Sequence, residues 1–121
     1  MNNIILQQYG LKFNIIIDKD NNREARVSGG SQSVYLDDYL MTGNYKEFYS
    51  DELLPEIENA IQGNNFDPDG GGDNTFLIID YPQSFLKRIN GIDPQLSIPT
   101  EDLKEIIESW IEFLTINGLE K

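Results

Sequence analysis

Acidic residues alternate with glycines in one segment of the sequence, and carboxylates in such an arrangement can bind calcium. Asp67, Asp69 and Asp73 surround three consecutive glycines, a pattern that calcium-binding loops share. An EF-hand loop that began at Asp67 would need an oxygen ligand at its fifth position and a glutamate at its twelfth, where Gly71 and Ile78 stand. We therefore expect no metal ion at this segment.

The same segment does not match a phosphate-binding loop, because no GKS or GKT follows the glycines and three aspartates would repel an anion. Two interpretations stay open. The segment is predicted either to be a flexible surface loop that leads into a strand at Thr75, or to be a contact loop that becomes ordered on a partner. In the second case Asp67, Asp69 and Asp73 are partner-binding residues.

The residue types on which most enzymes and metal sites depend are missing from the chain. It contains no cysteine and no histidine, which excludes disulfides, thiolate ligands, cysteine nucleophiles and the commonest general base. It also contains no G-x-S-x-G, Walker or H-E-x-x-H motif. Paired carboxylates would suffice for glycoside hydrolysis, but a chain of 121 residues rarely encloses a saccharide. We predict a non-enzymatic protein without a cofactor and keep an unrecognised carboxylate enzyme as the weakest alternative.

The charge of the chain is strongly negative and unevenly distributed. The chain has nine basic and 21 acidic residues, which gives a net charge of −12. Nucleic acid is therefore a poor partner. Residues 1–46 hold five acids and five bases, whereas residues 47–121 hold sixteen acids and four bases. No cation occurs between Lys46 and Lys87. This asymmetry predicts an acidic interaction surface, and the alternative is a solvated face that maintains solubility.

The sequence has no stretch that approaches the roughly 18 consecutive apolar residues of a membrane span. It also lacks a basic segment followed by a long apolar segment at its start, which is the pattern of a secretory signal. We therefore predict a soluble cytoplasmic protein that does not bind a membrane.

Alternating apolar residues predict a β-hairpin in the first third of the chain. Its strands are residues 11–17 and 23–28, joined by a polar turn, and residues 4–8 are either a further strand or a short lead-in. Helical spacing follows in residues 34–40 and again in residues 54–61. Ser50 is a candidate cap of this second helix, Pro55 is placed in its first turn and Gly63 ends it.

The remainder of the chain is predicted to contain a central strand, over residues 75–80, that is buried on both faces and ends before Pro82. A short helix over residues 84–89 and an extended loop over residues 91–99 follow. Thr100 is the candidate cap of a final amphipathic helix that stops at Asn117-Gly118. Together these elements predict a single α+β domain over residues 1–121, with a small mixed or antiparallel sheet packed by about three helices.

Four glutamates of the final helix share one face. Glu101, Glu105, Glu108 and Glu112 follow at spacings of four, three and four, which places them on a ridge opposite the apolar side of the helix. Like charges at these spacings repel by a few tenths of a kcal/mol per pair. Either solvent tolerates the ridge or a cationic partner binds it, and in the second case all four are partner-binding residues.

Aromatic residues are concentrated in residues 35–49, where they alternate with carboxylates. Some of these rings must cover the sheet, but tyrosine is also enriched at protein interfaces because it combines contact area with a polar tip. Tyr45 and Tyr49 are therefore candidates for docking to lysine and arginine side chains of another protein, through cation–π contacts and charge-assisted hydrogen bonds.

The run IPTEDLKEIIESWIEFL, residues 98–114, resembles the C-terminal helix of several small bacterial immunity proteins. These proteins neutralise toxin domains of contact-dependent growth inhibition and other polymorphic toxin systems. The resemblance covers about a seventh of the chain and otherwise extends to size, acidity and α+β character. It implies an antitoxin that occludes the active site of a cognate, basic nuclease toxin. The alternative is an acidic accessory or protein-interaction module whose charge serves solubility.

Overall fold

The protein folds as an α+β structure, as the sequence predicts. A computed structural model describes residues 1–28, 34–41 and 45–120. The elements in chain order are α1 (Asn3–Gln8), β1 (Lys12–Ile17), β2 (Arg23–Ser28), α2 (Val34–Leu40), the π-helical turn η2 (Phe48–Leu53), α3 (Leu54–Gln62), β3 (Asp69–Gly72), β4 (Thr75–Ile78), β5 (Gln83–Arg88), β6 (Leu96–Pro99) and α4 (Thr100–Ile116).

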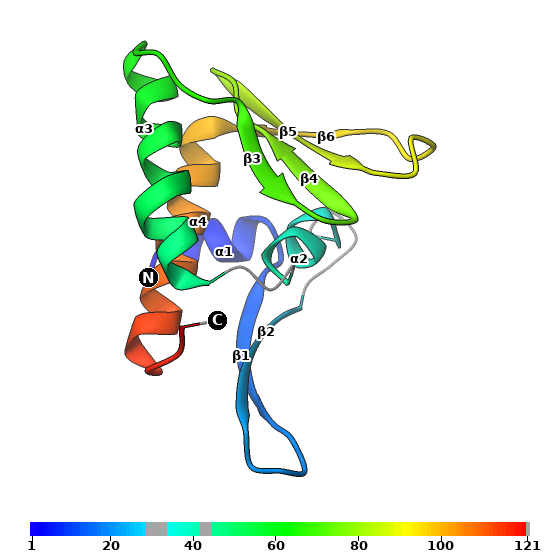
Figure 1. Cartoon of the computed structure of the whole chain (residues 1–121), viewed down its shortest axis with the longest axis vertical. Coiled ribbons are helices and arrows are strands. Elements are labelled where there is room, and N and C mark those ends of the chain that lie inside the picture. The colour runs from blue at the N-terminus through cyan, green and yellow to red at the C-terminus, as the bar shows by residue number, and fades with distance from the viewer. Residues whose placement is uncertain (29–33, 42–44, 121) are drawn as a thin grey trace.

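The strands form two separate antiparallel sheets. Four of them have the order β3-β4-β5-β6, in which each strand pairs with the next along the chain, and β1 pairs with β2 alone. Helices α3 and α4 pack against each other along one side of the molecule, beside the four-stranded sheet (Figure 1). The β1–β2 hairpin projects away from the other elements, and its turn lies at the far end of the molecule (Figure 1).

The core is built around the apolar face of α4. Leu103, Ile106, Ile107 and Leu114 are completely buried, and each such side chain contributes about 1.5–3 kcal/mol of burial free energy. Trp110 continues the same face and forms an edge-to-face contact with Phe13 of β1, with ring centroids 5.0 Å apart. The helix therefore anchors both the sheet and the base of the hairpin, and its predicted register and its stop at Asn117 are confirmed.

Several local predictions for the first half are also confirmed. The strands of the hairpin and helix α2 occupy the predicted residues. Pro55 lies in the first turn of α3, and Gly63 ends that helix with a left-handed φ of 79°. Ser50 is not its cap, because it lies inside η2, which continues directly into α3.

Of the two alternatives for residues 4–8, the strand is wrong, because these residues belong to helix α1, which precedes the hairpin. The Asn2 side chain caps this helix, since its Oδ1 accepts a hydrogen bond from the backbone N–H of Ile5 at 3.2 Å. Ile5 and Leu6 are buried, and the helix packs against α4. The short apolar cluster of residues 4–6 therefore belongs to a helix of six residues that depends on its cap and on tertiary contact with α4 for stability.

Three predictions for the second half are wrong as well. The segment predicted as helix 84–89 lies almost entirely in strand β5 (Gln83–Arg88), and the segment predicted as loop 91–99 ends in strand β6. In β5 the buried positions Ser84 and Leu86 alternate with more exposed neighbours, which is the period of two that a strand requires. The glycine segment, predicted as a loop, forms the edge strand β3.

Two further boundaries differ from the predictions. Strand β4 ends at Ile78, well before Pro82, and its buried and half-buried residues alternate although it lies inside the sheet. Thr100 is the first residue of α4 and not its cap, a position that Pro99 takes. Its hydroxyl donates instead to the carbonyl of Asp80 and lies 2.8 Å from Ser84 Oγ, so it connects the start of α4 to the sheet.

We expect Thr100→Val to lower the free energy of unfolding by about 1–2 kcal/mol, because the isosteric side chain fills the same buried space without its hydrogen bonds. Urea unfolding followed by the fluorescence of Trp110 measures the change. Thr115→Val, on the exposed side of the same helix, is the matched control and should change stability by less than about 0.5 kcal/mol. Equal losses in the two variants would contradict the structural role of Thr100.

Candidate functional site

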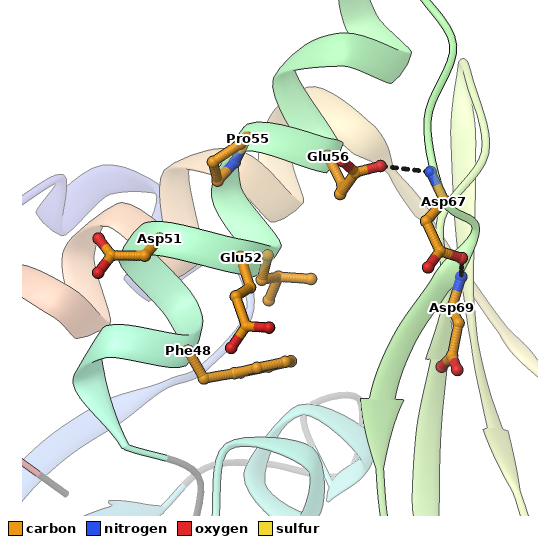
Figure 2. A pocket seen from close by; sticks show the side chains of 8 residues that line it. Phe48, Asp51, Glu52, Pro55, Glu56, Asp67 and Asp69 are labelled. Carbon is orange, nitrogen blue, oxygen red and sulfur yellow. Dashed lines mark hydrogen bonds between the residues drawn. The ribbon is translucent and has the colours of Figure 1, made fainter.

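An acidic cleft of about 320 Å³ lies between the start of α3 and the edge of the sheet. Its acidic lining residues come from two parts of the chain: Asp51, Glu52 and Glu56 from η2 and α3 on one side, Asp67 and Asp69 from the β3 side. The Asp51 carboxylate points away from the β3 side (Figure 2). Phe48 also lines the cleft and presents the only aromatic ring among its lining residues. We call these five carboxylates and Phe48 the acidic cleft.

Backbone hydrogen bonds hold the two walls of the acidic cleft together. The Glu56 carboxylate accepts a hydrogen bond from the backbone N–H of Asp67, across the gap between the walls (Figure 2). Asp67 Oδ1 accepts from the N–H of Asp69 at 3.0 Å, and Asp69 Oδ1 accepts from the N–H of Gly71 at 2.9 Å. Aspartate side chains that bond to their own following backbone stabilise turns. These carboxylates are therefore positioned before any ligand arrives.

A buried tyrosine fixes the sheet edge behind the cleft. The hydroxyl of Tyr39 donates a hydrogen bond to the carbonyl of Gly70 at a distance of 2.5 Å, and the Tyr39 ring is completely buried. Burial raises the pKa of Tyr39 well above that of a free tyrosine, and the neighbouring Tyr49 and Asp69 raise it further. This hydrogen bond connects helix α2 to strand β3 at Gly70, the residue that follows Asp69.

We expect Tyr39→Phe to lower the free energy of unfolding by about 1–2 kcal/mol at neutral pH, because the buried Gly70 carbonyl loses its donor. A raised folded-state pKa means that the folded protein retains the proton more tightly than the unfolded chain does. The contribution of Tyr39 to the free energy of unfolding is therefore fully present below the ordinary tyrosine pKa of about 10, and it falls as pH rises above that value. The phenylalanine variant should lose part of that alkaline decline.

Urea unfolding at a series of pH values measures both effects of Tyr39→Phe. Tyr81→Phe is the matched control, because the Tyr81 ring is 45% exposed and should contribute less than about 0.5 kcal/mol. An alkaline decline that is identical in the native chain and in Tyr39→Phe would contradict the assignment.

No basic residue lines the acidic cleft. The ion pairs within residues 1–28, 34–41 and 45–120 lie elsewhere, between Arg26 and Glu24, between Lys46 and Glu120, and between the Met1 ammonium and Glu112. The five carboxylates therefore present uncompensated negative charge toward solvent. The described residues also contain no group of three or more carboxylates arranged to hold a metal ion.

The structure brings together only part of the predicted aspartate set. Asp67 and Asp69 line the acidic cleft, whereas Asp73 lies in the turn between β3 and β4, where its N–H donates to the carbonyl of Thr75. The contact assigned to Asp67 and Asp69 stays a prediction, now with a defined location. Asp73 is separate from it.

The glutamate ridge of α4 is partly occupied by the chain itself. Glu105 accepts a hydrogen bond from the Asn2 side chain at 3.2 Å, and Glu112 lies 2.6 Å from the Met1 ammonium. Glu101 accepts from the Tyr81 hydroxyl at 3.4 Å, while Glu108 is exposed. Because α1 packs on this side of α4, the ridge is not one continuous free surface.

The two candidate tyrosines have different environments. Tyr49 is completely buried, and its hydroxyl points to the carbonyl of Leu40, so the structure corrects its predicted contact with a partner. Tyr45 is 60% exposed, and its partner contact stays a prediction. Sequence reasoning did not single out Glu52, Glu56 or Phe48 as site residues. The signal that could have found them is the cation-free segment between Lys46 and Lys87.

Comparison of the chain with protein-family models, with curated proteins and with solved structures found no match. In the described part of the chain, no helix is long and apolar enough to cross a membrane. The candidate site therefore rests on its own geometry and charge.

Proposed function

We propose that this protein is an immunity protein that binds a cognate basic toxin domain, of the nuclease class, and covers its active site. The observation that carries the proposal is the acidic cleft, in which five carboxylates from two parts of the fold face solvent with no cation beside them. A surface of this kind complements a cation-rich groove.

The chemistry of nucleases supplies that complement. A nuclease must present lysine or arginine side chains to the phosphates of its substrate, and carboxylates can occupy the same positions. Long-range attraction between the two surfaces accelerates association, whereas close hydrogen-bonded pairs determine how slowly the complex dissociates.

The geometry of the acidic cleft favours a protein partner with protruding basic side chains. Hydrogen bonds to the backbone hold Asp67 and Asp69 in place, so little side-chain entropy is lost on binding. Phe48 offers an aromatic ring next to these carboxylates, and a lysine or arginine that enters the cleft can contact both.

The test begins with the neighbouring reading frame, which should encode a protein that ends in a basic toxin domain. That domain is expressed in a susceptible bacterium with and without this chain, and growth is measured. The purified pair is then assayed for nuclease activity at increasing molar ratios. We expect protection of growth and stoichiometric loss of nuclease activity. A toxin domain that stays fully active beside an excess of this chain would contradict the proposal, as would a location within a metabolic operon.

The same purified pair separates this proposal from an acidic accessory module. Charge-driven association slows as salt is added, because exposed charges are screened beyond about 8–10 Å at physiological ionic strength. An association rate that does not depend on salt would favour the accessory module, in which the charge serves solubility alone.

A further inference from the structure

The outer edge of strand β1 carries backbone groups without partners among the described residues. The N–H of Asp18 donates to the carbonyl of Asn22 at the end of the hairpin, and hydrogen-bonded pairs alternate along an antiparallel ladder. In the observed register, Lys12, Asn14 and Ile16 therefore bond to β2. The N–H and C=O groups of the three residues between and after them (Phe13, Ile15 and Ile17) point away from β2, and no other described residue bonds to them.

This edge is also apolar and accessible near its tip. Ile17 is 62% exposed and Ile16 is 45% exposed, on a hairpin that extends beyond the helices and the larger sheet (Figure 1). An uncovered strand edge with exposed isoleucines is a template for pairing with another strand. The edge of β2 is less available, because Ala25 and Val27 are buried.

The hairpin differs from the rest of the chain in charge. Residues 12–28 contain four bases and three acids, so they carry a small positive charge in a protein whose net charge is −12. Two copies that met through the acidic second half of the chain would repel each other. On the hairpin, a second copy meets much less repulsion than on the acidic half.

We propose that β1 pairs with β1 of a second copy of this chain, antiparallel and about a two-fold axis at Ile15. Only registers that place outward-pointing residues opposite each other form hydrogen bonds. The register centred on Ile15 places Phe13 of each copy opposite Ile17 of the other, and the residues of these two symmetry-related pairs exchange N–H···O bonds. It also places Lys12 opposite Asp18 of the second copy, an opposite-charge pair that stabilises a cross-strand contact.

Registers shifted by one residue pair in either direction are less favourable. A shift toward the start of β1 places Lys12 opposite Ile16, and a shift toward its end places Phe13 opposite Lys19. Only the register centred on Ile15 matches both charge and apolar contacts. Because the interface is small, we expect a weak dimer whose population rises with concentration. This inference is independent of the proposed toxin-binding function, since it uses none of the residues of the acidic cleft.

The first test uses cysteine cross-linking in the full chain, which contains no native cysteine. In the proposed dimer the Cα atoms of the two copies of residue 15 lie about 5.5 Å apart, within the range of about 4.4–6.8 Å that a disulfide spans. The two copies of residue 17 are displaced by about 13 Å along the strands. Under mild oxidation, Ile15→Cys should form a covalent dimer and the more exposed Ile17→Cys should not.

The second test measures the mass of the native chain by sedimentation from micromolar to millimolar concentration. Ile17→Pro removes an outward N–H that the monomer does not use, and proline is tolerated on strand edges whose N–H faces solvent. Ile17→Thr keeps this N–H and is the matched control. We expect the native chain and Ile17→Thr to dimerise with rising concentration and Ile17→Pro to stay monomeric.

Two results would overturn the proposal. The first is a native chain that stays monomeric at every concentration. If, in that case, Ile17→Pro also fails to protect against a toxin, the edge of β1 binds the toxin and not a second copy. The second is an Ile17→Cys variant that cross-links as readily as the Ile15→Cys variant, because random collisions favour the more exposed thiol. If Ile17→Pro fails to fold, as judged by circular dichroism, the two cysteine variants alone decide the question.

Discussion

Gly72→Ala is expected to lower the free energy of unfolding by about 3 kcal/mol, the largest loss that we predict for a single methyl group in this chain. Gly72 adopts a φ of 127°, which side-chain-bearing residues rarely tolerate. A Cβ at this position would lie 2.7 Å from the Cα of Phe76 and would also collide with the carbonyl oxygen of Thr75. Both are backbone atoms of β4, so relief of the collision requires β3 to move away from the sheet.

Gly63→Ala is the matched control for Gly72→Ala. Gly63 also has a left-handed φ, 79°, but nothing lies within 4 Å of the position that a Cβ would take. Its substitution should therefore cost only the conformational penalty of about 1 kcal/mol. Urea unfolding of both variants, followed by Trp110 fluorescence, measures the difference. Similar losses in the two variants would show that the close approach of Gly72 to β4 does not stabilise the fold.

The same substitution links stability to the candidate site. Asp69, at the start of β3, lines one wall of the acidic cleft. If β3 is displaced in Gly72→Ala, this wall loses its position relative to α3. We therefore expect the variant to bind a basic partner more weakly even at temperatures at which it remains folded.

Sequence reasoning succeeded where a local signal dominates. Helix α4 has an apolar stripe that runs over four turns, and five of its six predicted stripe residues are buried: Leu103, Ile106, Ile107, Trp110 and Leu114. The hairpin was equally clear, because two alternating runs flank a polar turn that Asp18 stabilises through hydrogen bonds to the N–H groups of Asp20 and Asn22. In both elements the pattern of apolar and polar residues that predicts the structure lies within fewer than twenty consecutive residues.

The failures concern short elements whose own sequence carries a weak pattern. Strand β3 consists largely of glycine, which has low β propensity, and it exists because Tyr39 and β4 hold it in place. Strand β6 is four residues long and pairs with β5 across a loop. Helix α1 is equally short, and its contact with α4 lies at the other end of the sequence. The contacts with Tyr39 and α4 lie outside any local window of sequence, whereas the pairings β3–β4 and β5–β6 are local but involve strands too short or too rich in glycine to carry a clear β pattern.

Only one wall of the acidic cleft could be predicted from the sequence. Charge counting located the cation-free segment, and the Asp67–Asp73 motif located one wall of the acidic cleft. The opposite wall depends on η2, whose i→i+5 hydrogen bonds change the helical phase. This phase buries Tyr49 and leaves Asp51 and Glu52 exposed. A helical wheel at 100° per residue also places Tyr49 on the buried side with Leu53 and Ile57, but it does not predict that the exposed carboxylates lie opposite the β3 side.

The double variant Asp51→Lys/Glu52→Lys is expected to slow association with the cognate toxin domain by about tenfold to a hundredfold at low salt. Both side chains are exposed and line the acidic cleft, and neither forms a hydrogen bond with a described residue outside η2. The fold should therefore survive the change, which circular dichroism can verify. Stopped-flow fluorescence, or surface plasmon resonance with immobilised toxin domain, measures the rate.

A matched charge change elsewhere decides whether the effect belongs to the cleft or to the net charge of the whole protein. Glu101→Lys/Glu108→Lys alters the net charge by the same amount, but both residues are on the exposed side of α4 and neither lines the cleft. At physiological salt, where charges farther from the contact than about 8–10 Å are screened, the α4 variant should slow association only slightly if the cleft binds the toxin. The difference between the two variants should shrink as salt is added. Equal effects would assign the steering to total charge, and a larger effect in the α4 variant would move the binding surface from the cleft to the glutamate ridge.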